Sequence, residues 1–115
     1  MKLCTPGQAQ IEQHYADLSG KPFFAALVQY LNSGPVCAMV WEGDNAVAIC
    51  RKMLGATMPL DSEPGTFCGN FCADVCRNIC HGSDSVESAL SEITLWFGEG
   101  ELNNNQDHSA PWVYE

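Results

Sequence analysis

The 115-residue sequence predicts one small domain of the α/β sandwich class, in which helices pack on a sheet. Amphipathic stretches with the helical period alternate with an apolar run that is typical of a buried strand. A chain of this length can bury about two thirds of the surface that its unfolded form exposes, which is enough for one core. No low-complexity tract or internal repeat indicates disorder or a solenoid.

Two helices are predicted near the start of the chain. Gln8–Tyr15 is a short helical candidate, which the turn at Leu18-Ser-Gly20 ends. Pro22 suits the start of a second helix, which the sequence Asn32-Ser-Gly-Pro35 ends. Its apolar residues recur at helical spacing, namely Phe23, Phe24, Leu27, Val28 and Leu31.

A strand and a third helix are predicted next. Val36–Trp41 is a continuous apolar run between turn residues, as expected for a strand that is buried on both faces. Asp44 is the expected N-cap of a helix that continues to Leu54 and ends at Gly55.

The second half begins with a loop, residues 56–65, that contains two prolines and is long enough to suggest a function. A short helix from Phe67 to about Cys76 is followed by an extended piece, Arg77–Cys80, and a turn with capping residues, His81–Ser85. A long final helix is predicted from its apolar stripe, which consists of Val86, Ala89, Leu90, Ile93, Trp96 and Phe97. The polar tail, Glu99–Glu115, ends in aromatic residues that are expected to dock on something.

The charge balance limits the classes of partner. Five Lys and Arg against fourteen Asp and Glu give a net charge of -9, which disfavours binding to nucleic acid or to acidic membranes. An anionic ligand therefore requires a local concentration of positive charge. No apolar run approaches the roughly 20 residues of a membrane helix, and the N-terminus lacks the apolar core of a signal peptide. We expect a cytoplasmic protein whose seven cysteines are thiols.

Four of these cysteines, at positions 68, 72, 76 and 80, are spaced by four residues, which raises the question of a metal or redox site. On a continuous helix, each would be rotated by about 40° from the one before, so the thiols would not converge on one point. Structural zinc sites usually show two close pairs with a long gap, and redox sites prefer Cys-x-x-Cys. We therefore predict no metal site, and interpret Cys72, Cys76 and Cys80 as small packing residues.

His81 follows this row of cysteines, where an extended piece turns into the N-terminus of a helix. Neutral imidazole is a good nucleophile near pH 7, and exposed amides at a helix N-terminus favour a bound anion. A single histidine is more often structural than catalytic, so its context decides the interpretation.

That context is Asn78-Ile-Cys-His81-Gly-Ser-Asp-Ser85, which closely resembles the active-site signature Asn-x-x-His-Gly-Ser-Asp of nucleoside diphosphate kinases. The resemblance extends from about residue 14 to the C-terminus. Its further motifs are His14-Tyr-x-Asp-Leu, Lys21-Pro-Phe-Phe24, Ser33-Gly-Pro, Met39-Val-Trp-Glu-Gly43, Arg51-x-Met-Leu-Gly55, Asp61-Ser-x-Pro-Gly-Thr66, Leu95-Trp-Phe97 and Trp112-Val-Tyr-Glu115.

The resemblance implies a ferredoxin-like antiparallel sheet flanked by helices and a ping-pong phosphate transfer. The γ-phosphate of a nucleoside triphosphate such as ATP would pass to a nucleoside diphosphate through a phosphohistidine, with Mg²⁺ on the phosphates. His81 would be the nucleophile, and Glu92 would hold the other nitrogen of its ring. The implied nucleotide contacts are Phe23 and Val75 on the base, Asn78 at the ribose, and Tyr15, Arg51 and Thr57 at the phosphates. The family also implies a homo- or hetero-oligomer, either a hexamer or a tetramer.

Two departures from the family pattern bear on activity. Cys68 stands where the family normally has a phosphate-binding arginine, so a charge-assisted hydrogen bond of roughly 1.5 to 3 kcal/mol is lost. Residues 1–115 are also expected to form a single, N-terminally truncated domain, without the family's first strand, first helix and Lys-Pro-Asp-Gly motif. The alternative prediction is therefore an impaired or inactive member that acts as a subunit or interaction module.

Overall fold

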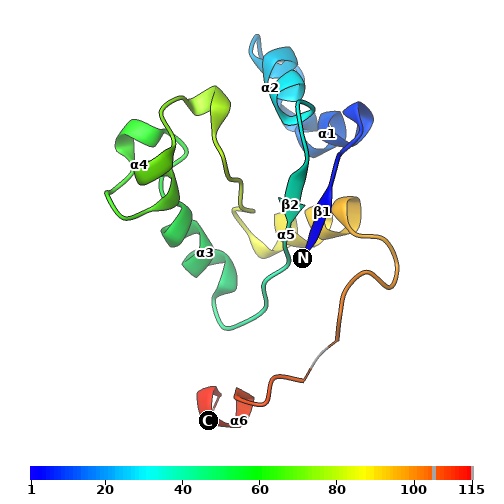
Figure 1. Ribbon diagram of the computed structural model, residues 1–115, viewed down its shortest axis with the longest axis vertical. Helices are drawn as coiled ribbons and strands as arrows, with labels where there is room; N and C mark the ends of the chain where they lie inside the picture. The colour runs from blue at the N-terminus through cyan, green and yellow to red at the C-terminus, as the bar shows by residue number, and fades with distance from the viewer. Residues whose placement is uncertain (105, 115) are drawn as a thin grey trace.

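The computed structural model describes residues 1–104 and 106–114, without the side chain of Cys76. It shows an α+β fold that consists of a small two-stranded sheet and short helices (Figure 1). The strands are β1 (Lys2–Cys4) and β2 (Val36–Ala38), and the α-helices are α1 (Gln8–His14), α2 (Phe24–Leu31), α3 (Ala46–Leu54), α4 (Phe67–Phe71), α5 (Val86–Trp96) and α6 (Ala110–Val113). Three 3-10 helices are η1 (Ala16–Leu18), η2 (Pro59–Asp61) and η3 (Val75–Arg77).

The two described strands pair in antiparallel fashion, with Leu3 opposite Cys37 at the centre of the register. The predicted strand over Val36–Trp41 was too long, and the expectation that it is buried on both faces was wrong. Exposure alternates along β2, and Cys37 at its centre is exposed. The physical reason is that β2 has one described neighbour, so one of its edges and part of its surface remain uncovered.

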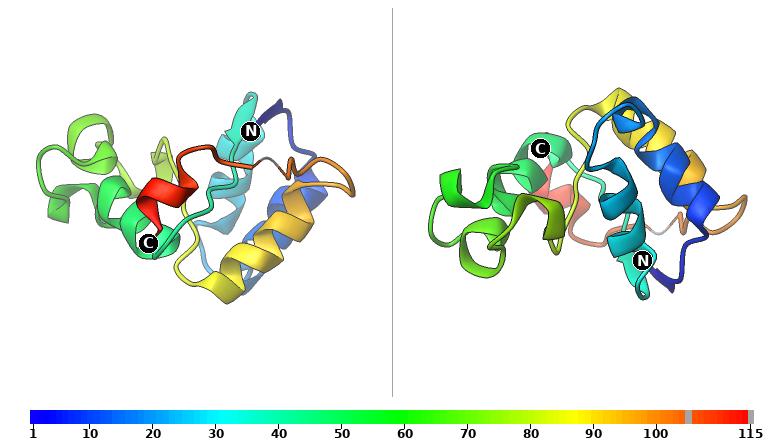
Figure 2. Two further views of the ribbon diagram at one scale, coloured as in Figure 1. Left: turned by 90° about the horizontal axis from the view of Figure 1, so that it is seen from below. Right: turned by 90° about the horizontal axis from the view of Figure 1, so that it is seen from above.

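Helices α1, α2 and α5 form one side of the molecule, with α1 packed against both of the others (Figure 2). Ile11 on α1 is fully buried, and the Gln10 side chain donates a hydrogen bond to the Leu95 carbonyl on α5. The predicted helices over these segments are confirmed within a residue or two at each end. The Ser85 hydroxyl caps α5 by accepting a hydrogen bond from the amide of Ser88, at 3.0 Å.

Helices α3 and α4 form the other side of the molecule (Figures 1 and 2). The third helix is confirmed, but its N-cap is Asn45 and not the expected Asp44. Asn45 adopts the left-handed conformation, with φ of 54°, which asparagine tolerates better than most residues do, so the helix starts one residue later. Gly55 ends α3 as predicted, and its φ of 94° favours glycine.

The short helix expected to reach about Cys76 was too long in the prediction, because α4 ends at Phe71. Gly69 and Asn70 are poor helix formers within it, and the Asn70 side chain instead accepts a hydrogen bond from the Gly65 amide. Cys72 is already extended, and the chain then forms η3 before it reaches His81.

The described core is small, and the molecule is open. Six apolar residues are buried among those described, which are Pro6, Ile11, Val28, Pro59, Cys68 and Phe97. The radius of gyration is 15.5 Å, whereas a compact domain of this length has about 13 Å. In the tail, whose Asn105 and Glu115 lie outside the described residues, Trp112 is 84% exposed, whereas the Tyr114 hydroxyl lies close to Gly43.

Candidate active site

His81 and Glu92 form an ion-pair-type contact, which we call the His–Glu pair. His81 lies in the extended segment before α5, and Glu92 lies on the second turn of that helix. The Nε2 atom of His81 is 3.1 Å from each carboxylate oxygen of Glu92. Because a carboxylate can only accept, Nε2 carries a proton, and the Nδ1 atom of a neutral ring is left with a free lone pair. The His81 side chain is 44% exposed.

Ser83 holds the carboxylate of this pair in place. Its hydroxyl donates a hydrogen bond to the Glu92 Oε2 atom at 2.5 Å. A partner on the carboxylate restricts its rotation and therefore the orientation of the imidazole ring. The sequence analysis did not single out Ser83, although the residue is part of the His-Gly-Ser-Asp signature, which was the available signal.

Two aromatic rings from the end of α1 face the ring of His81 edge-on. The ring centroids of His14 and His81 are 4.6 Å apart, and those of Tyr15 and His81 are 6.0 Å apart. The Trp96 indole donates a hydrogen bond to the Nδ1 atom of His14 at 3.1 Å. Trp96 thus fixes the ring of His14, which packs edge-on against His81, a contact that sequence patterns alone did not indicate.

Burial changes the ionisation of both His14 and Tyr15. Burial and the neighbouring His81 lower the pKa of His14, so its ring is neutral at pH 7. Burial, and to a lesser extent the charge of Glu92, raise the pKa of Tyr15 to about 12. The Tyr15 phenol therefore remains a hydrogen-bond donor at neutral pH.

Arg51 and Asn78 connect the loop after α3 with the segment that carries His81. The Arg51 guanidinium donates to the Gly82 carbonyl at 3.2 Å and makes a long contact of 3.5 Å with the Thr57 hydroxyl. The Asn78 amide donates to the Thr57 carbonyl at 3.1 Å. Its Oδ1 atom is buried and has no hydrogen-bond partner among the described residues. The structure therefore brings Arg51, Thr57 and Asn78 close to one another. Among the described residues, the Asn78 Oδ1 atom remains able to accept a hydrogen bond from a ligand.

Phe23 and Val75, the residues expected on the two faces of a base, lie on neighbouring elements. Phe23 precedes α2 and Val75 belongs to η3, and α2 packs against η3. Tyr30 of α2 adds a hydrogen bond to the Arg77 carbonyl at 3.4 Å. Both apolar side chains are about 40% exposed, Phe23 at 40% and Val75 at 39%, so each has uncovered surface for a ligand.

Two surface grooves flank α1, and neither of them is lined by these predicted nucleotide contacts. One lies between α1 and α2, and the other lies between α1 and α5 and includes His14 and Glu92. The candidate site is defined by its hydrogen-bond donors and by His81, because phosphates are recognised by donors and charge more than by an enclosed apolar cavity.

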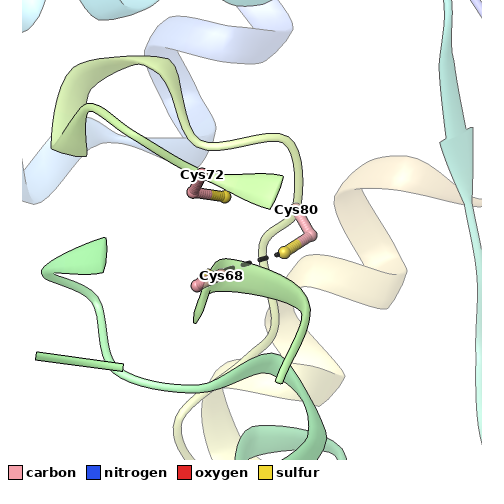
Figure 3. Close-up of side chains that lie close together, drawn as sticks. All are labelled: Cys68, Cys72 and Cys80. Carbon is pink, nitrogen blue, oxygen red and sulfur yellow. Dashed lines mark hydrogen bonds between the residues drawn. The ribbon is translucent and has the colours of Figure 1, made fainter. Parts of the chain in front are cut away.

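The row of cysteines contradicts the expectation that its thiols do not converge. The sulfur atoms of Cys68, Cys72 and Cys80 all lie within 4.8 Å of one another (Figure 3). The spacing argument assumed a continuous helix, whereas α4 ends at Phe71 and the chain folds back. Cys68, which was expected to mark a missing phosphate-binding arginine, is 4% exposed and contacts Cys80. The prediction for Cys76 concerns a side chain outside the described residues.

The sequence model of the family described as nucleoside diphosphate kinase matches residues 1–102. The chain belongs to the nucleoside diphosphate kinase family. Over 115 residues it is 61% identical to a nucleoside diphosphate kinase of Neurospora crassa and 60% identical to one of Aspergillus fumigatus. Each alignment covers 100% of this chain, and 76% and 75% of these relatives respectively.

Solved structures of nucleoside diphosphate kinases confirm the predicted ferredoxin-like α+β fold. The apo enzyme from Encephalitozoon cuniculi superposes with a TM-score of 0.91 at 41% identity, covering 98% of this chain and 76% of that one. The enzyme from Halobacterium salinarum in complex with CDP gives 0.93 at 40% identity, covering 99% and 76%. The family consists of nucleotide-binding phosphotransferases, so the predicted enzyme class is confirmed at the level of the family. No helix among the described residues has the length and apolarity needed to span a membrane.

Proposed function

We propose that this nucleoside diphosphate kinase chain transfers the γ-phosphate of a nucleoside triphosphate, such as ATP, to a nucleoside diphosphate through a phosphohistidine on His81. The observation that carries the proposal is the His–Glu pair. Glu92 holds the Nε2 proton, so the Nδ1 lone pair is free, and the His81 side chain is 44% exposed. A complex of a related enzyme with CDP supports a nucleotide as the ligand.

In the first step, Nδ1 of His81 attacks the γ-phosphorus, the new nitrogen–phosphorus bond forms, and the bond to the β–γ bridging oxygen breaks. The nucleoside diphosphate leaves with the electron pair of that bond. In the second step, a terminal β-phosphate oxygen of another nucleoside diphosphate attacks the phosphohistidine, and His81 is released unchanged. Glu92 stabilises the positive charge that the ring acquires when Nδ1 is phosphorylated.

The remaining predicted residues bind the nucleotide. Arg51, Thr57 and Tyr15 supply charge and donors to the phosphates, and Arg51 is the local positive charge that the net charge of -9 requires. The Oδ1 atom of Asn78, which has no hydrogen-bond partner in the described part of the chain, can accept a hydrogen bond from a ribose hydroxyl. The uncovered surfaces of Phe23 and Val75 suit contact with the base, which would be recognised by packing more than by its edge.

Mg²⁺ enters as part of the substrate, bound to the nucleotide phosphates. The carboxylate oxygens of Glu92 accept hydrogen bonds from His81 and Ser83, so the role proposed for this residue is to hold the ring of His81. The catalytic roles proposed here therefore belong to side chains of this chain, His81 and Glu92.

The second candidate function is that of a subunit with impaired catalysis in an oligomer of the family, either a hexamer or a tetramer. The open shape and the 84% exposed Trp112 favour it, because such surfaces are normally covered by a partner. Size-exclusion chromatography with light scattering distinguishes an oligomer from a monomer. The cytoplasmic location expected from the sequence remains a prediction.

The test of the proposed reaction is incubation of the chain with γ-labelled ATP and Mg²⁺. We expect an acid-labile, base-stable phosphoenzyme that is discharged by added nucleoside diphosphate. His81→Ala should abolish the label, at least about a thousandfold, whereas His108→Ala, a matched histidine change in the exposed tail, should retain it. Absence of label on the folded, unsubstituted chain would contradict catalysis and favour the second candidate.

A further inference from the structure

The three sulfur atoms of Cys68, Cys72 and Cys80, which we call the thiol cluster, come from two segments of the chain, α4 with its C-cap residue and the segment before His81. Cys68 lies in α4, Cys72 is the extended residue after that helix, and Cys80 lies in the segment before His81. Figure 3 shows the three side chains meeting in the space between these segments. The cluster is distinct from the His–Glu pair, although Cys80 and His81 are adjacent in sequence.

The spacing of these sulfur atoms matches the edge of a metal tetrahedron. Four thiolates at about 2.3 Å from a Zn²⁺ ion lie roughly 3.8 Å from one another. The Cys68 and Cys80 sulfur atoms are 3.7 Å apart, and all three lie within 4.8 Å of one another. A shift of about 1 Å or less in a side chain would therefore complete the geometry of three ligands.

The thiol cluster is partly open to solvent. Cys68 is buried, whereas Cys72 and Cys80 are only half-buried, so one side of the cluster faces solvent. A divalent cation at the cluster would displace the thiol protons and bind the three thiolates.

We propose that Cys68, Cys72 and Cys80 form a binding site for a thiophilic divalent cation, with Zn²⁺ as the ligand. Each thiol loses one proton to solvent, three zinc–sulfur bonds form, and a water molecule occupies the fourth position. The resulting cluster carries one negative charge, and the Arg51 guanidinium, whose electrostatic effect reaches Cys80, partly compensates it. Thiolate ligands favour Zn²⁺ over Mg²⁺ and Ca²⁺, which prefer oxygen.

Zinc at this position would join α4 to the segment that carries the nucleophile. Cys80 directly precedes His81, and Gly82 accepts the hydrogen bond from Arg51. The metal would therefore stabilise the packing of α4, where Cys68 is buried, against the segment before His81. The proposal does not depend on phosphate transfer, and its test does not use activity.

The experiment is a titration of the reduced full chain with Co²⁺ under anaerobic conditions, followed by displacement with Zn²⁺. We expect a thiolate-to-cobalt charge-transfer band in the near ultraviolet and the intense visible bands of tetrahedral cobalt, saturating at one ion per chain. Zinc should abolish both and raise the melting temperature. A denatured sample of the starting material must contain seven free thiols, which excludes a disulfide as a cause of failure.

The variants Cys68→Ser, Cys72→Ser and Cys80→Ser should each lose the charge-transfer band and the thermal shift. Cys37→Ser is the matched control, because Cys37 is exposed on β2 outside the cluster. A second group, His14, His81 and Glu92, also lies close enough to hold a cation. Binding without a thiolate band, lost in His81→Ala, would assign the ion to that group and overturn the proposal, as would the absence of binding to the unsubstituted chain.

Discussion

His81 and Cys80 are neighbours in the chain, but their side chains belong to two regions with different chemistry. The His–Glu pair is partly exposed, and its members are linked by hydrogen bonds to Ser83 and to each other. The thiol cluster has a buried member, and its contacts are between neutral sulfur atoms. The His–Glu pair is therefore suited to proton transfer and nucleophilic attack, whereas the thiol cluster offers soft sulfur donors.

The difference shows how one short extended segment can serve two sites. Successive side chains of an extended backbone point to opposite sides, so Cys80 and His81 face different surroundings. Arg51 is associated with both regions, since it donates to the Gly82 carbonyl and affects the ionisation of Cys80. We expect changes in one region to leave the chemistry of the other largely intact, and the following predictions test that separation.

The largest effect is expected for Glu92→Gln. A glutamine amide can donate to Nε2, which would favour the tautomer with its proton on Nδ1 and block the attack. We expect the rate of phosphoenzyme formation to fall on the order of a hundred- to ten-thousandfold, measured by quenched flow with γ-labelled ATP. Glu87→Gln is the matched control on the same helix. Equal rates for the two variants would show that Glu92 does not orient the nucleophile.

A smaller effect is expected for Ser83→Ala, which removes the hydrogen bond to Glu92 but keeps the His–Glu pair. Hydrogen bonds to charged groups contribute roughly 1.5 to 3 kcal/mol, and only part of this is expressed in the transition state, so we expect about a tenfold slower phosphorylation. Ser83→Thr should restore most of the rate, because it keeps the hydroxyl. Failure of threonine to rescue the rate would indicate a packing effect in place of the hydrogen bond.

The smallest effects are expected in the pH dependence of stability. His14, beside the His–Glu pair, acts at acidic pH, and the thiol cluster acts at alkaline pH. The folded-state pKa of His14 lies below its ordinary value of 6.5, so the unfolded chain binds more protons as the pH falls through 6.5. Stability should therefore decrease from pH 7 downward, as measured by urea denaturation. His14→Gln should flatten this acidic decrease; an unchanged slope would contradict the assignment.

As the pH rises into the alkaline range, we expect the thiol cluster to cause the first decrease in the free energy of unfolding. The pKa of Cys68 is raised from 9.0 to about 12 and that of Tyr15 from 10.0 to about 12. The unfolded chain loses these protons first, so stability should fall as the pH rises above 9. Cys68→Ala should reduce the decrease that begins near pH 9, to which Cys80 with its raised pKa also contributes, and should leave the decrease above pH 10. An unchanged slope in this variant would show that the thiol cluster does not cause the decrease.

The sequence predicted the elements whose formation depends on nearby residues. The periodicity of α2 and α5, and the glycine that ends α3, are local signals, and the structure confirms them. The predicted length of β2 was wrong because the burial of a strand depends on its neighbouring strands. The predicted N-cap of α3 was wrong because no simple sequence pattern indicates the left-handed conformation of Asn45.

By itself, the sequence also determined the family, through the signature around His81 and the motifs that accompany it. It could not predict the support of that histidine by Ser83, His14 and Trp96, whose contacts join residues from separate helices and loops. Nor could it predict the thiol cluster, because a spacing rule holds only along one continuous element. The tertiary structure decided that point: α4 ends at Phe71, the chain folds back, and Cys80 is brought to within 3.7 Å of Cys68.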